Sequence, residues 1–211
     1  MAQAKLFVLE GIDGAGTTTQ AKLLAAWLQE RGIPAHLTRE PSDGPVGRLI
    51  REILCGKHAG VGGDTMALLF AADRMDHLSR EILPALEKGI HVITDRYYHS
   101  SLAYQDVEAD RGWVEELNRR ARRPDVTFLL DVSAEEAARR RAEAGRMKER
   151  YDDLDLQRRI AENYRRLPKL LPGEDFRILD GARPIPAIQQ ELRKATAVLL
   201  GIEAREETIS P

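Results

Sequence analysis

Cysteine is nearly absent from this sequence, with Cys55 as its single example among 211 residues. One cysteine excludes an internal disulfide and fits a reducing compartment. The chain also has no apolar run long enough to span a membrane, and the short apolar stretch after Lys5 is too brief for a signal peptide. We therefore expect a cytoplasmic protein with no membrane segment.

An excess of charge of either sign is missing as well, because 32 lysines and arginines face 34 aspartates and glutamates and leave a formal net charge of -2. No global field then favours nucleic acid or a membrane surface. The arginine cluster within 119–123 has no interleaved aromatic residues, so we interpret it as an exposed helix end and expect no nucleic-acid partner. Any binding of anions must come from arginines that are placed locally.

Short apolar runs alternate with segments whose apolar residues recur at helical spacing. The predicted strands are 6–9, 34–38, 91–94, 126–130 and 176–179. The predicted helices are 18–31, 46–54, 65–88, 113–122, 154–171 and 185–200. Asp64 is expected to be the N-cap of helix 65–88. A further helix is expected to begin at a capping box formed by Ser133 and Glu136. This alternation predicts a single α/β domain over 1–211, a five-stranded parallel sheet flanked by helices, with a frayed tail at about 203–211.

A glycine-rich loop lies between the first predicted strand and the first predicted helix. Its residues are Gly11, Ile12, Asp13, Gly14, Ala15, Gly16, Thr17, Thr18 and Thr19. A loop of this pattern in this position is typical of a P-loop, in which backbone N–H groups and a helix N-terminus hold phosphate oxygens. We expect the loop to bind ATP, and the hydroxyl of Thr18 to be a ligand of Mg²⁺.

The loop departs from the usual pattern G-x-x-x-x-G-K-[ST] at one position, because Thr17 stands where lysine is expected. Threonine carries no charge and cannot reach the β- and γ-phosphates. We therefore expect the loss of the lysine to impair catalytic turnover more than it impairs nucleotide binding.

A polar segment, 95–105, follows the third predicted strand. An aspartate at a strand end beside a P-loop is placed to hold Mg²⁺ through water, which makes Asp95 the second candidate metal ligand. Arg96 can clamp a phosphate through two parallel hydrogen bonds. In a parallel sheet, ligands bind beyond the carboxyl ends of the strands, where both loops are expected.

Four segments in order carry a family resemblance. Residues 95–105 match D-R-[FY]-x-x-S-[ST]-x-A-Y-Q at every fixed position, and 7–14, 38–41 (T-R-E-P) and 68–74 (L-L-F-x-A-x-R) match further motifs. With these motifs the sequence resembles the thymidylate kinase family over most of its length. The resemblance implies the P-loop nucleoside monophosphate kinase fold with a lid segment, a homodimer, and transfer of the γ-phosphoryl group of ATP to dTMP with Mg²⁺.

The resemblance also implies which residues bind dTMP. They are Arg39, Phe70, Arg74, Arg96, Ser100, Ser101, Tyr104, Gln105 and Tyr164. Phe70 is expected to stack on the thymine, Arg74 to donate to its O4, and Tyr104 to leave no room for a 2′-hydroxyl. Asp13 is expected near the sugar 3′-hydroxyl and the metal, and Arg96 at the monophosphate.

The arginine-rich segment at about 139–152 is the expected lid. A charge run of this kind is most often a solvated helix face. The resemblance implies instead that the lid delivers an arginine to the transferring phosphoryl group when the phosphate loop has no arginine after its acidic residue, and Gly14 stands at that position here. We expect Arg150, and after it Arg146, to be the catalytic cation beside Asp13 and Arg96.

Two alternatives remain open at this point. One is a kinase of the same fold that acts on another pyrimidine deoxynucleotide, such as dUMP. The other is a non-catalytic nucleotide-binding protein that has lost turnover together with the lysine. The intact motif at 95–105 argues against the second alternative, because a protein without turnover has no physical need for it.

Overall fold

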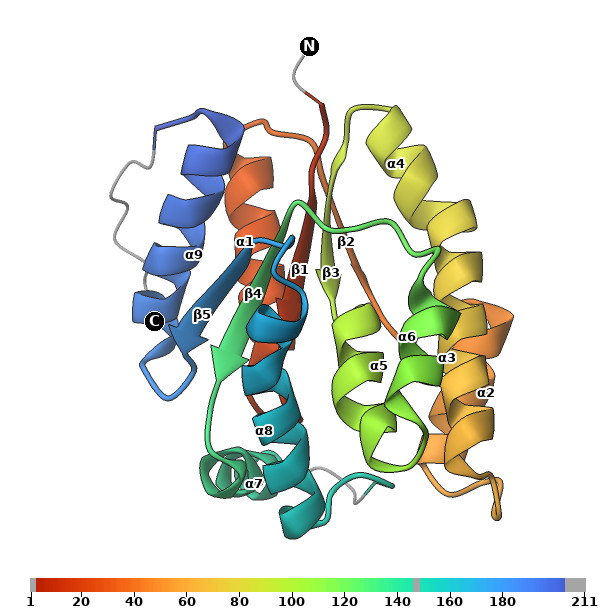
Figure 1. Ribbon diagram of the computed structural model, residues 1–211. Helices are drawn as coiled ribbons and strands as arrows, with labels where there is room; N and C mark the ends of the chain where they lie inside the picture. The colour runs from red at the N-terminus through yellow and green to blue at the C-terminus, as the bar shows by residue number, and fades with distance from the viewer. Residues whose placement is uncertain (1–2, 146–148, 204–211) are drawn as a thin grey trace.

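The strands form one parallel sheet. The structure, a computed structural model, describes residues 3–145 and 149–203. Its strands are β1 (Leu6–Glu10), β2 (Ala35–Arg39), β3 (His91–Asp95), β4 (Val126–Asp131) and β5 (Phe176–Asp180). They lie in the order β2-β3-β1-β4-β5, and each neighbouring pair is parallel. This confirms the predicted five-stranded parallel sheet, with β1 at its centre and every carboxyl end at the same edge (Figure 1).

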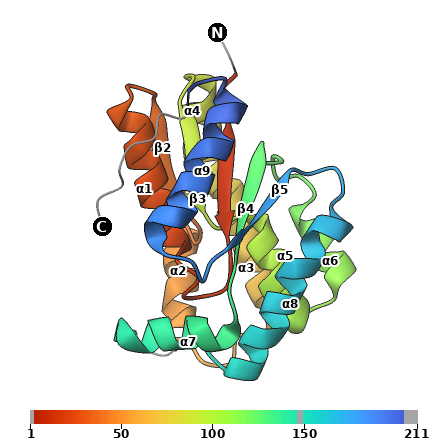
Figure 2. The ribbon, with the colours of Figure 1, turned by 90° about the vertical axis from the view of Figure 1, so that its left-hand side faces the viewer.

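Helices cover both faces of the sheet. They are α1 (Thr17–Glu30), α2 (Pro45–Leu54), α3 (Gly63–His77), α4 (Leu83–Glu87), α5 (Tyr98–Tyr104), α6 (Arg111–Asn118), α7 (Ala134–Glu143), α8 (Leu154–Leu170) and α9 (Ile185–Leu200), with a π-helical turn η1 (Leu78–Ile82) and a 3-10 turn η2 (Gln105–Val107). α1 and α9 pack together on one face, and α5 and α8 pack together on the other (Figure 2). Because both faces are covered, β1 is buried along its whole length.

The long predicted helix 65–88 is confirmed as one continuous helical stretch, 63–87, in which the π-helical turn η1 joins α3 to α4. Pro84 accounts for the π-helical turn within this stretch, since proline has no N–H to donate and its ring clashes with the carbonyl one turn earlier. Asp64 is not the N-cap that the sequence predicted. Gly62 is the N-cap, and Asp64 lies in the first turn of α3, where a carboxylate still suits the helix dipole.

The helix that opens after β4 begins as predicted. The Oγ of Ser133 accepts a hydrogen bond of 3.2 Å from the backbone N–H of Glu136 and caps α7. α7 then runs across the carboxyl-terminal end of the sheet (Figure 2). The polar segment after β3, for which the sequence predicted no element, is α5 followed by η2. Both α5 and α7 therefore lie beside the edge at which ligands of parallel sheets bind.

Candidate active site

The loop after β1 turns into α1 through two glycines in the left-handed region. Gly14 has φ 95° and Gly16 has φ 98°. Gly16 is the N-cap of α1 and contributes no side-chain hydrogen bond, so no side chain of the cap competes with an anion for the first N–H groups of the helix. The local backbone is therefore that of a phosphate-binding loop.

A cavity of about 690 Å³ opens over this loop and is called the donor cavity here. It is lined by residues 13–20, by Arg96, by residues 139–141 of α7 and by residues 182–185 at the start of α9. The predicted loop residues from Asp13 to Thr19 thus share one cavity with Arg96. Ile12 is buried, and it and Gly11 lie outside the lining.

The two predicted metal ligands lie in contact. The Oγ1 of Thr18 donates a hydrogen bond to the Oδ2 of Asp95. The Oδ1 of Asp95 is buried and has no hydrogen-bond partner among the described residues. Hydroxyl and carboxylate oxygens are the hard ligands that Mg²⁺ prefers. The residues present at this point therefore fit a magnesium ion.

A second cavity, of about 120 Å³, is called the acceptor cavity. Its lining residues are Asp13, Glu40, Pro41, Leu54, Phe70, Arg96, Ser100, Tyr104, Gln105, Glu149 and Tyr151. Four predicted dTMP-binding residues besides Arg96 are therefore brought together in it. Asp13 and Arg96 line both cavities, so the donor and acceptor cavities adjoin at this pair.

Arg96 is fixed by several neighbours. Its Nη2 lies 2.8 Å from the Oδ1 of Asp13, and its Nη1 donates to the Oγ of Ser100 at 3.1 Å and to the hydroxyl of Tyr164 at 3.2 Å. Burial opposes the charge of Arg96, but Tyr104 and Asp13 raise the pKa of its guanidinium well above the ordinary value. Its φ of 73° is a left-handed conformation that costs free energy in a residue with a side chain, and such strain is concentrated at functional sites.

Glu10, the last residue of β1, is a site residue that sequence reasoning missed. It is fully buried, and its carboxylate accepts hydrogen bonds from the backbone N–H of Tyr97 at 2.8 Å and from the hydroxyls of Ser100 and Tyr164 at 2.7 and 2.8 Å. Burial raises the pKa of Glu10, while the charge of Arg96 acts against the shift. A carboxylate at the end of an otherwise apolar strand was the signal that could have identified it.

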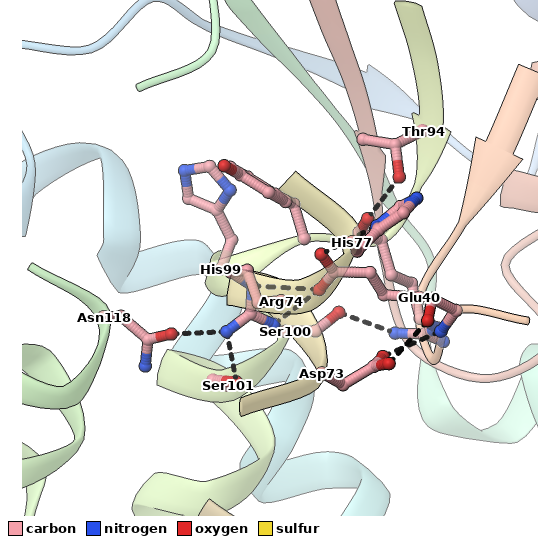
Figure 3. A network of polar contacts seen from close by, with 12 residues as sticks. Glu40, Asp73, Arg74, His77, Thr94, His99, Ser100, Ser101 and Asn118 are labelled. Atoms are coloured by element: carbon pink, nitrogen blue, oxygen red, sulfur yellow. Dashed lines mark hydrogen bonds and ion pairs between the residues drawn. The ribbon is translucent and has the colours of Figure 1, made fainter. Parts of the chain in front are cut away.

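Arg74 is 1% exposed and lies behind the acceptor cavity rather than in its lining. Its Nε and Nη2 donate to the Oε2 of Glu40 at 2.9 and 2.6 Å (Figure 3). Its Nη1 donates to the Oγ of Ser101 at 3.2 Å and to the Oδ1 of Asn118. Arg74 and Ser101 thus support Glu40, which lines the cavity, and their predicted contacts with thymine stay predictions.

Arg39 and Arg150 lie outside the lining of the acceptor cavity. Arg39 is exposed, pairs with Asp43 at 3.1 Å and lines a separate cavity of about 220 Å³ beside Thr18. The Nη1 of Arg150 donates to the carbonyl of Val61 at 2.6 Å, and its Nη2 lies 2.9 Å from Glu108, so it points away from the phosphate loop. Arg146 lies outside the described residues, as does the tail after 203.

Two other arginines contact the phosphate loop. The Nη1 of Arg141 donates to the backbone carbonyl of Asp13, and the Nη1 of Arg140 donates to that of Ala15 at 3.4 Å. Both belong to α7. The arginine run was visible in the sequence, but the face of α7 that meets the loop depends on how the helix packs on the sheet.

A parallel sheet with a phosphate loop after its first strand and an adjoining acceptor cavity defines a P-loop protein of the nucleoside monophosphate kinase class. The profile of the family described as Thymidylate kinase matches residues 9–192. This chain belongs to the thymidylate kinase family.

Named relatives agree with this assignment. The chain is 42% identical over 205 residues to a probable thymidylate kinase of Thermococcus kodakarensis, covering 93% of this chain and 98% of the relative. It is 44% identical over 191 residues to one of Pyrococcus abyssi (88% and 92%), and 39% identical over 198 residues to one of Methanococcus maripaludis (90% and 94%). These relatives favour neither of the two alternative functions. Within the described residues, no helix combines the length and the apolar character needed to cross a membrane.

Proposed function

We propose that this protein transfers the γ-phosphoryl group of ATP to dTMP and releases ADP and dTDP. The observation that carries the proposal is the pair of Asp13 and Arg96, which lines both the donor and the acceptor cavity. Phosphoryl transfer needs the two substrates in line and positive charge around the migrating group, rather than covalent participation of the protein. The names of the relatives support dTMP as the acceptor.

The donor cavity is proposed to hold ATP with its phosphates over the loop. The N-terminus of α1 and the backbone N–H groups of Gly14 and 16–18 supply the positive ends of dipoles there, whereas the N–H of Ala15 donates to the carbonyl of Ile12 at 2.9 Å. Thr18 and Asp95 are proposed to hold Mg²⁺, which when bound would neutralise charge on the phosphate oxygens.

The acceptor cavity is proposed to hold dTMP with its phosphate at Arg96. Phe70 offers an aromatic surface for the base, and Tyr104 packs beneath the sugar. The hydroxyl of Tyr104 accepts a hydrogen bond of 3.0 Å from the backbone N–H of Asp13, which ties the wall of the acceptor cavity to the phosphate loop. Arg96 can then bind the acceptor phosphate while its other contacts keep it in place.

We also propose that residues 139–152 act as a lid and that Arg150 or Arg146 reaches the transferring group when the lid closes. Arg150 must leave the carbonyl of Val61 and the carboxylate of Glu108 to do so. Closure would exclude water and so prevent hydrolysis of ATP.

A homodimer and a cytoplasmic location belong to the same proposal. Leu68 and Met75 lie two turns apart on one side of α3 and are 49% and 42% exposed, which supports that side as the face that meets a second copy. Light scattering on the native protein and on Leu68→Lys tests the dimer, and an unchanged mass in the variant contradicts this face. The exposed lone thiol of Cys55 is compatible with a reducing cytoplasm.

A coupled assay of ADP release with a panel of monophosphates tests the proposed reaction. We expect turnover with dTMP, weaker turnover with dUMP and little with dCMP. Uracil lacks only the methyl group of thymine, and the loss of one methyl group costs about 1–3 kcal/mol of binding free energy in the transition state. ATP binding without turnover of any monophosphate would contradict the proposal and favour a non-catalytic nucleotide-binding protein.

A further inference from the structure

We infer that Arg141 is a positioning residue of the phosphate loop: it places a positive charge against the loop that lacks a lysine, and it joins the loop to residues 149–152. The inference rests on the proposed kinase function. It assigns a role to a residue of α7 that touches neither the expected acceptor nor Thr17.

The approach of α7 to the loop depends on Gly14. A Cβ at this position would lie 2.5 Å from the carbonyl oxygen of Ala137 and 3.1 Å from the Cγ of Arg141. The φ of Gly14 is also left-handed, at 95°. A side chain at residue 14, including an arginine, would therefore push α7 away from the loop. Gly14 excludes a cation within the loop at this position and at the same time admits Arg141 behind it.

Arg141 and Arg140 bind carbonyl groups of alternate peptide units in the loop. Arg141 donates to the carbonyl of Asp13, and Arg140 donates to that of Ala15 at 3.4 Å. In a planar trans peptide the N–H points opposite to the C=O, so the N–H groups of Gly14 and Gly16 are directed away from these guanidinium groups. A cation on the carbonyl also polarises the peptide and makes its N–H a stronger donor to phosphate.

Arg141 also contacts residues 149–152, the last part of the proposed lid. Its Nε lies 3.2 Å from the Oδ1 of Asp152, and the two side chains are each 9% exposed. The Oδ2 of Asp152 accepts a hydrogen bond of 2.7 Å from the backbone N–H of Glu149. Glu149 and Tyr151 line the acceptor cavity. One buried guanidinium thus connects the loop of the donor cavity with a wall of the acceptor cavity.

Burial makes this charge effective. A nearly buried pair is screened by salt much less than a pair in solvent. The Nη1 of Arg141 contacts the loop, whereas the carboxylate of Asp152 pairs with the Nε of the same guanidinium. Arg139, the neighbouring arginine of α7, is instead 57% exposed and pairs with Glu136 and Glu143.

The test is a double-mutant cycle between Thr17→Lys and Arg141→Gln, with kcat, both KM values and the Kd of ADP measured for every variant. We expect Arg141→Gln to lower kcat by about 10- to 100-fold, the range for residues that act through a group touching the ligand. We also expect the variant to bind ADP more weakly, with a higher Kd. In the Thr17→Lys background the same change should cost at least about threefold less, because the lysine restores the missing charge. A merely structural role would not produce this rescue.

The matched control is Arg158→Gln. Arg158 lies on α8 and binds Glu135 of α7, so its loss loosens α7 without touching the loop, and kcat should stay within about twofold of native. If Arg141→Gln does not fold, as judged by thermal melting, the cycle is run with Arg141→Lys, for which a smaller loss and the same rescue are expected. Additive losses in a folded, active protein overturn this inference alone. A native protein that forms no dTDP overturns the proposed function, and equal ADP affinities across the cycle then overturn the inference separately.

Discussion

The donor and acceptor cavities hold their functional groups in different ways. The donor cavity, about 690 Å³, is bounded by loop backbone and by arginines of α7, and the loop itself has no side-chain cation. The acceptor cavity, about 120 Å³, is bounded by side chains that buried groups hold in place. Ser100 of the lining donates to the buried carboxylate of Glu10, and Glu40 of the lining accepts from the buried Arg74 behind it. Positive charge on the donor side therefore comes from outside the loop, chiefly from the arginines of α7, whereas the charged groups on the acceptor side are held by buried partners.

This difference shows how a phosphate loop without lysine can remain part of an organised site. Preorganised charge is effective because it needs no rearrangement during the reaction. Arg96 provides such charge at the junction, with Asp13 and Ser100 holding it in place. Changes at the junction should then disturb both cavities, and changes on one side should disturb one substrate.

The largest effect is expected at the junction. Arg96→Ala should lower kcat by about 10²–10³-fold, as the loss of a preorganised charge partner usually does, and should raise the KM values of both ATP and dTMP. Arg96→Lys keeps the charge but not the planar fork, so it should recover only part of the loss. Steady-state kinetics with each substrate varied will measure this. A variant with changed ATP parameters and normal dTMP parameters contradicts the shared junction.

Glu10→Gln should affect the acceptor side alone. The amide keeps one oxygen as an acceptor, but its NH2 must face either the backbone N–H groups of Tyr97 and Ser100 or the hydroxyls of Ser100 and Tyr164. We therefore expect a loss of about 1–3 kcal/mol in the free energy of unfolding and a raised KM for dTMP with an unchanged Kd for ADP. Urea denaturation and calorimetry measure the two quantities. The control is Glu162→Gln at an exposed ion pair on α8, which should change neither. Weaker binding of ADP to Glu10→Gln would contradict the claim that a change in the acceptor cavity affects the binding of dTMP alone.

Much of this arrangement followed from the sequence, and the reasons are local. Strand β1, the glycines of the loop and the cap at Ser133 depend on residues close together in the chain, and these were predicted at their places. Pairing of side chains depends on distant residues. Arg150 binds Val61 and Glu108, which are 89 and 42 residues away in the sequence, and no local pattern predicts these partners.

The direction of the Arg74 side chain could not be predicted from the sequence for the same reason. The L-L-F-x-A-x-R motif places Phe70 and Arg74 one helical turn apart on α3, and the family resemblance implied that both contact the base. Within the protein the guanidinium donates to Glu40, 34 residues earlier, and to Asn118, 44 residues later, and neither partner could be read from the motif. A buried carboxylate needs a partner, and this requirement of the folded chain decides where the arginine points.

A smaller effect is expected at Tyr104, where ring and hydroxyl can be separated. Tyr104→Phe leaves the ring but removes a hydroxyl that accepts from the Asp13 N–H at 3.0 Å and from the Nη2 of Arg96 at 3.3 Å. Because Arg96 keeps other acceptors, kcat/KM should fall by about tenfold, equal to about 1.4 kcal/mol, mainly for the unsatisfied Asp13 N–H. The preference for dTMP over the ribonucleotide should persist in this variant and narrow in Tyr104→Ala. If the preference survives truncation, Tyr104 does not crowd the 2′ position.

The smallest effect concerns pH and the support of the acceptor wall. Burial disfavours the charge of His77, but Glu40, Glu81 and Asp73 face it and raise its pKa above 6.5. A raised folded pKa means that this stabilisation is complete below pH 6.5 and is lost as the pH rises through the folded pKa. As the pH rises above 6.5, the urea concentration at the unfolding midpoint should therefore decrease modestly in the native protein. The same increase in pH should lower the midpoint of His77→Gln by less. Parallel profiles for the two proteins would contradict this assignment.

The central claim is that the donor and acceptor cavities meet at Asp13 and Arg96 so that a phosphoryl group passes directly between two nucleotides. The most direct measurement is a single-turnover reaction of the native protein, in excess, with Mg²⁺, dTMP and ATP labelled at the γ-phosphate. The account predicts that the label passes into dTDP with one ADP formed for each dTDP. Label that stays in ATP, or that is released as inorganic phosphate, would contradict it.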